Sequence, residues 1–210
     1  MRKRIYAFLT VMILIIALFS PVTGTYSEAA TAKKTVTSVK VGTKVTVGNI
    51  NYKVTKLSKT SGEVSVTGVK KKTASLSIPA SFKLIVKSGK WRGTHTINVT
   101  SIGKKAFADN MKLKKLTIGA NVKTIGERAF YKTMNLRTVT LGKNVTTISQ
   151  YAFSLDYNLR TVTIPSGSAL KTIGKYAFKS CIKLNYFNFS NAKKLTTIGT
   201  GAFSDRKSVV

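Results

Sequence analysis

The feature that most constrains this chain is a phenylalanine that recurs at a nearly constant interval through its second half. Intervals of 23, 23, 25 and 25 residues separate Phe107, Phe130, Phe153, Phe178 and Phe203. Each of them follows an Ala, and an Ile stands five residues before each one. A repeat of this length cannot bury its apolar face alone, so stacked repeats must share a core. The sequence therefore predicts a solenoid.

Each repeat is expected to contain a short strand and a turn. A Leu six residues after each of the first four Phe opens a run of alternating apolar and polar residues, as in 113–118 and 159–164. Such alternation, with many β-branched residues, indicates a strand. A turn rich in Gly, Asn, Pro or Ser follows, then a second extended piece such as 122–125. The Ala-Phe segment is expected to form a short helical turn that points the Phe inward. Residues 100–210 are therefore predicted to be a β-rich solenoid of short strands and short helical turns.

The change of period from 23 to 25 residues can be placed within the repeat. Ile118 and Val122 are four residues apart, whereas Ile164 and Leu170 are six apart. The two extra residues therefore belong to the turn between the two strands. We expect the inward-facing columns to keep their register through the whole array.

The pattern Ile-Gly-x-x-Ala-Phe, with a Leu six residues later and then L-x-x-[VI]-x-[IL]-[PG], resembles the BspA-type leucine-rich repeat of bacterial surface proteins. The resemblance covers residues 100–204 and implies a leucine-rich-repeat array that binds host or neighbouring-cell ligands. Cys181 stands three residues after its Phe, where this family often has Cys, which implies a small buried residue. The equivalent positions hold Asn110, Thr133 and Asp156. A lone Cys in an exported chain is otherwise available for pairing between molecules.

The N-terminal half, residues 31–99, is predicted to be a β-rich cap module, because a repeat array needs an end that shields its first coil. Alternating residues in 43–47 and 50–55 flank Gly48-Asn49, which predicts a β-hairpin. Residues 63–67 and 75–79 are two further strand candidates. The segments 76–79 and 99–103 match the two strands of the repeat, so a first, irregular coil is expected to be divided by an insertion over 80–98 that contains Trp91.

Residues 1–30 have the organisation of a secretory signal peptide. Arg2, Lys3 and Arg4 precede an apolar run over 5–19, and small residues that suit cleavage follow, up to Ala30. The alternative is an uncleaved anchor, but a bilayer span needs about 20 apolar residues, and this run is shorter. We therefore expect a secreted, extracellular chain that is associated with the cell wall and has no membrane span after processing.

The composition argues against catalysis. The 210 residues include 36 Lys and Arg but only 6 Asp and Glu, a net charge of +30, with one His and one Cys. Neither a Cys/His zinc site nor an internal disulfide can be built from these residues. The acids fall at different phases of the repeat, and His95 has no evident Ser or Cys partner. We expect no enzymatic activity, no catalytic residues, no metal site and no cofactor.

The candidate ligand-binding residues lie on the outward face of the first strand of each repeat. With the fourth and sixth positions of the run facing inward, the third and fifth face outward, and the second lies where the chain bends. This places a basic stripe beside a threonine face. Its members are Lys114, Lys115, Arg137, Thr138, Thr140, Arg160, Thr161, Thr163 and Tyr186. The same Lys and Thr residues would also keep an open sheet soluble and discourage edge pairing.

Two functions fit these features. The first is adhesion or recognition at the cell surface, through a protein or glycan ligand on the basic, Thr-rich strand face. The alternative is a structural envelope protein that charge alone holds to anionic wall polymers, without a specific ligand. A chain this basic would also bind nucleic acid non-specifically in vitro, since it carries no motif that reads sequence.

Overall fold

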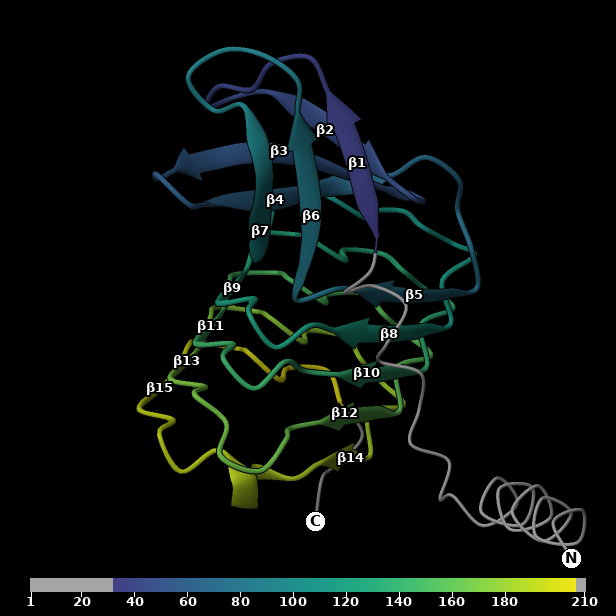
Figure 1. Ribbon diagram of the computed structural model, residues 1–210. Coiled ribbons are helices and arrows are strands. Elements are labelled where there is room, and N and C mark those ends of the chain that lie inside the picture. Colours follow the sequence, from purple (N-terminus) through teal and green to yellow (C-terminus); the bar gives the residue numbers. More distant parts are fainter. Residues whose placement is uncertain (1–31, 207–210) are drawn as a thin grey trace, which may run out of the picture.

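The computed structural model describes residues 32–206, and the predicted signal peptide, residues 1–30, lies outside them. The described chain forms a solenoid of stacked coils with a strand-rich module at its N-terminal end (Figure 1). The predicted solenoid is confirmed. Within the described residues, we find no helix with the length and apolar character that a bilayer crossing requires.

The N-terminal module is built from six strands of four to ten residues, many with alternating buried and exposed side chains. These strands are β1 (Lys33–Val36), β2 (Lys44–Val47), β3 (Ile50–Leu57), β4 (Ser61–Val69), β6 (Ser81–Val86) and β7 (Gly93–Ile102). The predicted hairpin is confirmed, because β2 and β3 pair antiparallel across Gly48-Asn49. Gly48 has a φ of +56°, a backbone conformation that glycine adopts without steric cost.

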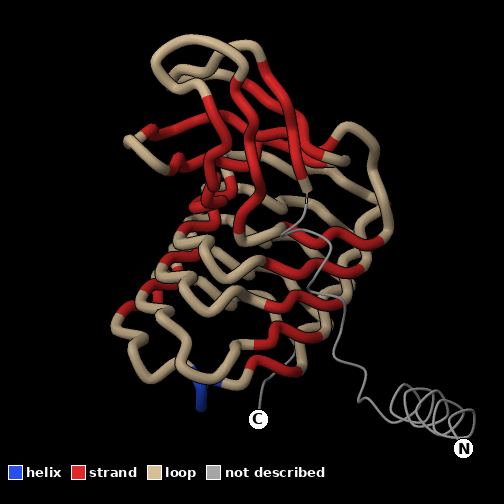
Figure 2. The backbone as a smooth tube through the Cα atoms, in the orientation of Figure 1, coloured by secondary structure: helices blue, strands red, loops and turns tan. Residues whose placement is uncertain are grey.

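The array consists of coils that each contribute one strand to each of two parallel ladders (Figures 1 and 2). The five-stranded sheet contains β5 (Ser75–Ile78), β8 (Lys115–Ile118), β10 (Thr138–Thr140), β12 (Thr161–Thr163) and β14 (Tyr186–Phe187). The second ladder contains β9 (Thr124–Ile125), β11 (Thr147–Ile148), β13 (Thr172–Ile173) and β15 (Thr197–Ile198). One 3-10 helix, η1 (Phe189–Asn191), follows β14.

The module and the array share one sheet and one core. The end of β7 pairs with β9, which makes the module strands and the second ladder a single ten-stranded sheet. On the other side, β5 pairs with β8 in full register. Between these two strands the chain leaves the array as the antiparallel β6–β7 hairpin. The first coil is thus divided by an insertion, and the buried residues of both regions form one continuous cluster.

The recurring phenylalanines form a ladder through the array. The rings of Phe107, Phe130, Phe153 and Phe178 stack with centroids 5.0 to 5.2 Å apart and nearly parallel planes. Phe203 continues the stack at 5.3 Å. This spacing is close to the distance of about 4.8 Å between paired strands. The coil-to-coil stack therefore forms the spine of the solenoid, as the sequence predicts.

The segment around each Ala-Phe pair is a non-helical turn, so the prediction of a helical turn at this place is wrong. The residue two before the Phe has a positive φ, as at Lys105 (+55°) and Arg128 (+52°). The amide of Phe107 donates to the carbonyl of Ala129 in the next coil. A helical turn would direct that amide back into its own coil. The hydrogen bonds between coils thus select turns here.

The longer repeats keep the register of the shorter ones. Thr147 on β11 pairs with Thr172 on β13, and Thr161 on β12 pairs with Tyr186 on β14. The extra residues lie in the turns that follow β12 and β14, where Gly167 has a φ of +67° and η1 forms. The prediction that the insertions leave the core columns intact is confirmed.

Candidate ligand-binding surface

The outward side chains of the five-stranded sheet form two columns in register. One column contains Ser75, Lys115, Thr138, Thr161 and Tyr186. The other contains Ser77, Thr117, Thr140 and Thr163. All of these side chains are exposed or partly exposed, whereas the residues between them are buried. The strand face that the sequence predicts is therefore one continuous surface, called the strand face below.

A basic stripe borders the strand face, where the chain enters each strand. The amide of Arg137 donates to the carbonyl of Lys114 at 2.8 Å, and the amide of Arg160 donates to that of Arg137 at 2.9 Å. These backbone hydrogen bonds place the three side chains in one column, and all three are exposed. Lys115 lies beside the column on β8. The structure therefore brings together the four predicted cationic residues, which we call the basic stripe.

Within residues 32–206, the acidic side chains lie away from the strand face. Glu127 lies in the turn after β9, where it pairs with Lys104 at 2.8 Å and with Arg128 at 3.0 Å. The hydrogen bond from Lys104 is the main cause of the lowered pKa of Glu127. Asp205 lies 3.9 Å from Lys179 in the corresponding turn of a later coil. The cations of the basic stripe therefore have no carboxylate neighbour on their own face.

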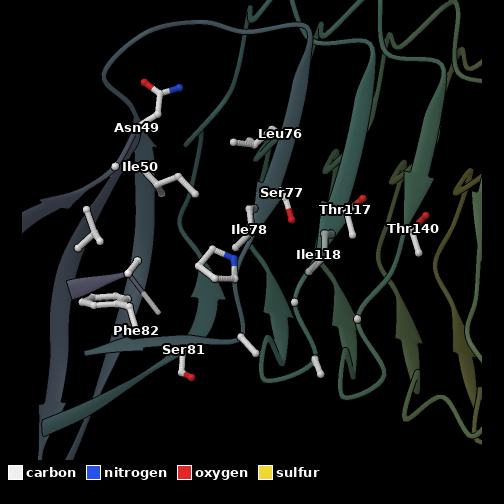
Figure 3. A pocket seen from close by; sticks show the side chains of 18 of the residues that line it. Asn49, Ile50, Leu76, Ser77, Ile78, Ser81, Phe82, Thr117, Ile118 and Thr140 are labelled. Atoms are coloured by element: carbon white, nitrogen blue, oxygen red, sulfur yellow. The ribbon is translucent and has the colours of Figure 1, made fainter. Parts of the chain in front are cut away.

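A groove of about 790 Å³ adjoins the strand face where the array meets the module (Figure 3). Ser77, Thr117 and Thr140 line it from three successive strands, and the β2–β3 hairpin and the start of β6 face them. Lys143, in the turn after β10, also lines the groove. The sequence pattern gives no sign of this groove, because its walls come from segments that are distant in sequence. Among the predicted site residues, Thr140 lines the groove. It pairs in register with Thr117, which also lines the groove.

A column of buried polar residues lies three positions after the phenylalanines. Asn110, Thr133, Asp156 and Cys181 are all at most 3% exposed. The thiol of Cys181 donates to the carbonyl of Phe153 at 3.1 Å. Burial, together with the charge of Asp156, raises the pKa of this thiol well above its usual value. Cys181 is thus the small buried residue that the resemblance implies.

Asp156 is the most constrained member of this column. Its Oδ1 atom accepts hydrogen bonds from the amide of Thr133 at 2.7 Å and from the hydroxyl at 2.8 Å. Its Oδ2 atom is buried without a partner. Burial raises the pKa of this carboxyl well above its ordinary value. Asp156 therefore supports the turn of the neighbouring coil and has no access to a ligand on the surface.

His95, for which the sequence shows no Ser or Cys partner, lies in the inserted hairpin of the module. His95 stacks on Trp91 with ring centroids 3.8 Å apart, in the β6–β7 insertion. Its Nε2 atom lies 3.1 Å from the carbonyl oxygen of Trp91. Among residues 32–206, no three His, Cys, Asp or Glu side chains are grouped so that they could hold a metal ion.

The sequence of residues 94–210 matches the family model described as the BspA type Leucine rich repeat region, in six copies. No curated protein matches the chain.

Three solved structures share the fold. The pneumococcal vaccine antigen PcpA has a TM-score of 0.63 and 23% identity, over 81% of this chain and 49% of that one. A leucine-rich repeat protein of T. pallidum has a TM-score of 0.55 and 23% identity, over 68% of this chain and 59% of that one. A leucine-rich repeat protein of Bacteroides ovatus has a TM-score of 0.52 and 24% identity, over 75% and 41%. The chain spans about half the length of these proteins.

Proposed function

The chain belongs to the BspA-type leucine-rich repeat family, a family of repeat-based binding or recognition proteins, and we propose that it mediates adhesion or recognition at the cell surface. Its ligand, a protein or a glycan of the host or of a neighbouring cell, binds the strand face beside the basic stripe. That a protein of the same fold is a pneumococcal vaccine antigen supports a place outside the cell.

In this proposal the three parts of the chain have separate tasks. Residues 1–30 direct export, residues 31–99 cap the array, and residues 100–210 present the ligand-binding face. The pairing of β7 with β9 supports the capping task, because it covers the end of the second ladder. High net charge then adds retention on anionic wall polymers to the specific binding.

The observation that carries the proposal is the separation of charge around the coil. The four cations of the basic stripe lie in register on one face, while the acids of the array lie in the turns or are buried. Like charges at coil spacing repel one another, because this spacing is shorter than the distance of about 10 Å over which 0.1 M salt screens charges. An anionic ligand that bridges the stripe relieves this repulsion, so binding and charge are linked at this face.

The test compares two variants that lose the same charge. The first replaces Lys114, Lys115, Arg137 and Arg160 with Gln, and the control replaces Lys40, Lys44, Lys70 and Lys71, which are exposed on the module. On a glycan and matrix-protein array at moderate salt, we expect the first variant to lose its ligand and the control to keep it. We expect the melting temperature of the first variant to be unchanged or slightly higher, because exposed charges contribute little to stability.

Equal loss of binding by both variants would show that only net charge matters. The chain would then be a structural envelope protein that follows polymer charge without a specific ligand.

A further inference from the structure

Resting on the function proposed above, we propose that the groove between module and array binds an extended acidic polysaccharide that runs along the solenoid axis. The groove spans several successive coils, from β5 through β8 and β10 to the turn at Pro165. Its volume of about 790 Å³ is within the range of sites that enclose small ligands. A polymer lying along the axis would occupy it and continue over the strand face.

The side chains that reach solvent in the groove indicate the class of ligand. The aliphatic residues beneath, Ile78, Ile118 and Leu141, are only 1% to 3% exposed. By contrast, Ser77 is exposed, and Thr117 and Thr140 are partly exposed. The groove also presents accessible apolar surface, because Pro79, Ala80 and Pro165 line it and are partly exposed. A sugar ring matches both features, since its C–H faces pack on apolar surface while its hydroxyl groups bond to a row of hydroxyl groups that donate and accept.

The spacing of this hydroxyl row favours a polymer of sugars. Ser77, Thr117 and Thr140 lie in register on three parallel strands, at a spacing of about 4.8 Å per strand. The stacked phenylalanine rings in the core of the array repeat at 5.0 to 5.2 Å. In an extended β-linked polysaccharide, each sugar advances the chain by about the length of one pyranose ring. This advance per sugar is close to the spacing between coils. Successive sugars can therefore meet equivalent hydroxyl groups on successive coils.

The charges around the groove select an acidic polymer. Among the described residues that line it, Lys143 is the charged one, and it is exposed in the turn after β10. Lys115 is exposed on the same strand as Thr117, on the side of the basic stripe. Carboxylate groups on the sugars would therefore meet cations along both sides of the polymer. The groove-lining residues directly after β8 and β10 include Gly119, Ala120 and Gly142, whose small size leaves room for the sugar rings.

The experiment measures two probes by isothermal titration calorimetry at moderate salt: hyaluronan oligosaccharides, and polyphosphate of the same total charge. The test variant carries Thr117→Val and Thr140→Val, which keep shape and remove two hydroxyl groups. The matched control carries Thr124→Val and Thr172→Val on the second ladder, where the threonines are equally half-buried. We expect the test variant to bind hyaluronan about tenfold more weakly, as the loss of two ordinary hydrogen bonds predicts. Its polyphosphate affinity and both affinities of the control should stay unchanged.

The remaining outcomes separate this inference from the proposed function. If the test variant binds hyaluronan like the wild type while the four-Gln variant of the basic stripe is weakened, the groove is not the site and the proposed function stands. If the wild type binds a neutral chitin hexasaccharide as tightly as hyaluronan of the same length, the acidic character of the ligand is refuted. If the wild type binds neither hyaluronan nor polyphosphate, the inference about the groove fails, whereas the proposed function fails only if the glycan and matrix-protein array also gives no ligand.

Discussion

The module and the array both bury aliphatic and aromatic side chains, but the strands that carry these side chains differ in length and in pairing. In the module, β3, β4 and β7 are eight to ten residues long and pair mainly through long, alternating strands. In the array, the strands are two to four residues long, and each coil depends on the coils before and after it. Figure 2 shows this contrast as long strands at one end and short, stacked ones along the rest. Stability in the array is therefore a property of stacking between neighbours.

The largest expected effect tests this dependence on stacking. Phe130 is fully buried between Phe107 and Phe153, so Phe130→Ala removes contacts to two neighbouring coils. We expect the free energy of unfolding to fall by about 3–5 kcal/mol, as measured by urea denaturation. Phe203→Ala is the control, because Phe203 is only partly buried and should cost less. Equal costs would mean that the ladder is not the spine.

A second prediction compares one glycine in each region. At Gly142 in the array, an added Cβ would collide with the carbonyl oxygen of Gly119 in the coil before it. At Gly48 in the module hairpin, an added Cβ meets nothing within 4 Å, and only the positive φ opposes it. We expect Gly142→Ala to lower the free energy of unfolding by about 2–3 kcal/mol, since backbone atoms must move. Gly48→Ala should cost about 1 kcal/mol. Thermal unfolding that ranks the two in the opposite order would contradict close packing of the turns.

The smallest effect concerns pH and the buried carboxyl of the array. The pKa of Asp156 is raised in the folded chain, so the folded state holds this proton more tightly than the unfolded state does. The stabilisation is complete below the unfolded pKa and is lost as the pH rises through the folded pKa. Asp156→Asn keeps an acceptor for Thr133 and supplies an uncharged amide where Oδ2 has no partner. We expect a gain of about 1 kcal/mol at neutral pH and above.

The measurement for Asp156→Asn is the melting temperature as a function of pH. The curve of the wild type should fall relative to that of the variant as the pH rises from acidic to neutral values. A constant difference between the two curves would show that Asp156 does not change its ionisation on folding.

Several parts of the candidate site follow directly from the sequence. The alternation in Lys115–Ile118 places Leu116 and Ile118 inside and Lys115 and Thr117 outside, as the structure shows. The nearly constant period then brings equivalent positions of successive coils into register. The geometry of the Ala-Phe turns did not follow in the same way, because Phe107 bonds to a carbonyl in the next coil. The residues around one Ala-Phe pair do not indicate which carbonyl of another coil the amide will bond to.

The sequence by itself determined the features that repeat: the coil period, the inward columns, the position of the extra turn residues and the outward basic stripe. Each depends on the spacing of apolar residues along one strand or from one coil to the next, and spacing is a property of the chain alone. Only the tertiary structure decided how β5 and β7 join the array on either side of the inserted hairpin. It also decided that the β2–β3 hairpin faces Thr117 and Thr140 across a groove. These contacts depend on where the chain returns after the insertion, and that path is fixed by packing between surfaces that no single segment encodes.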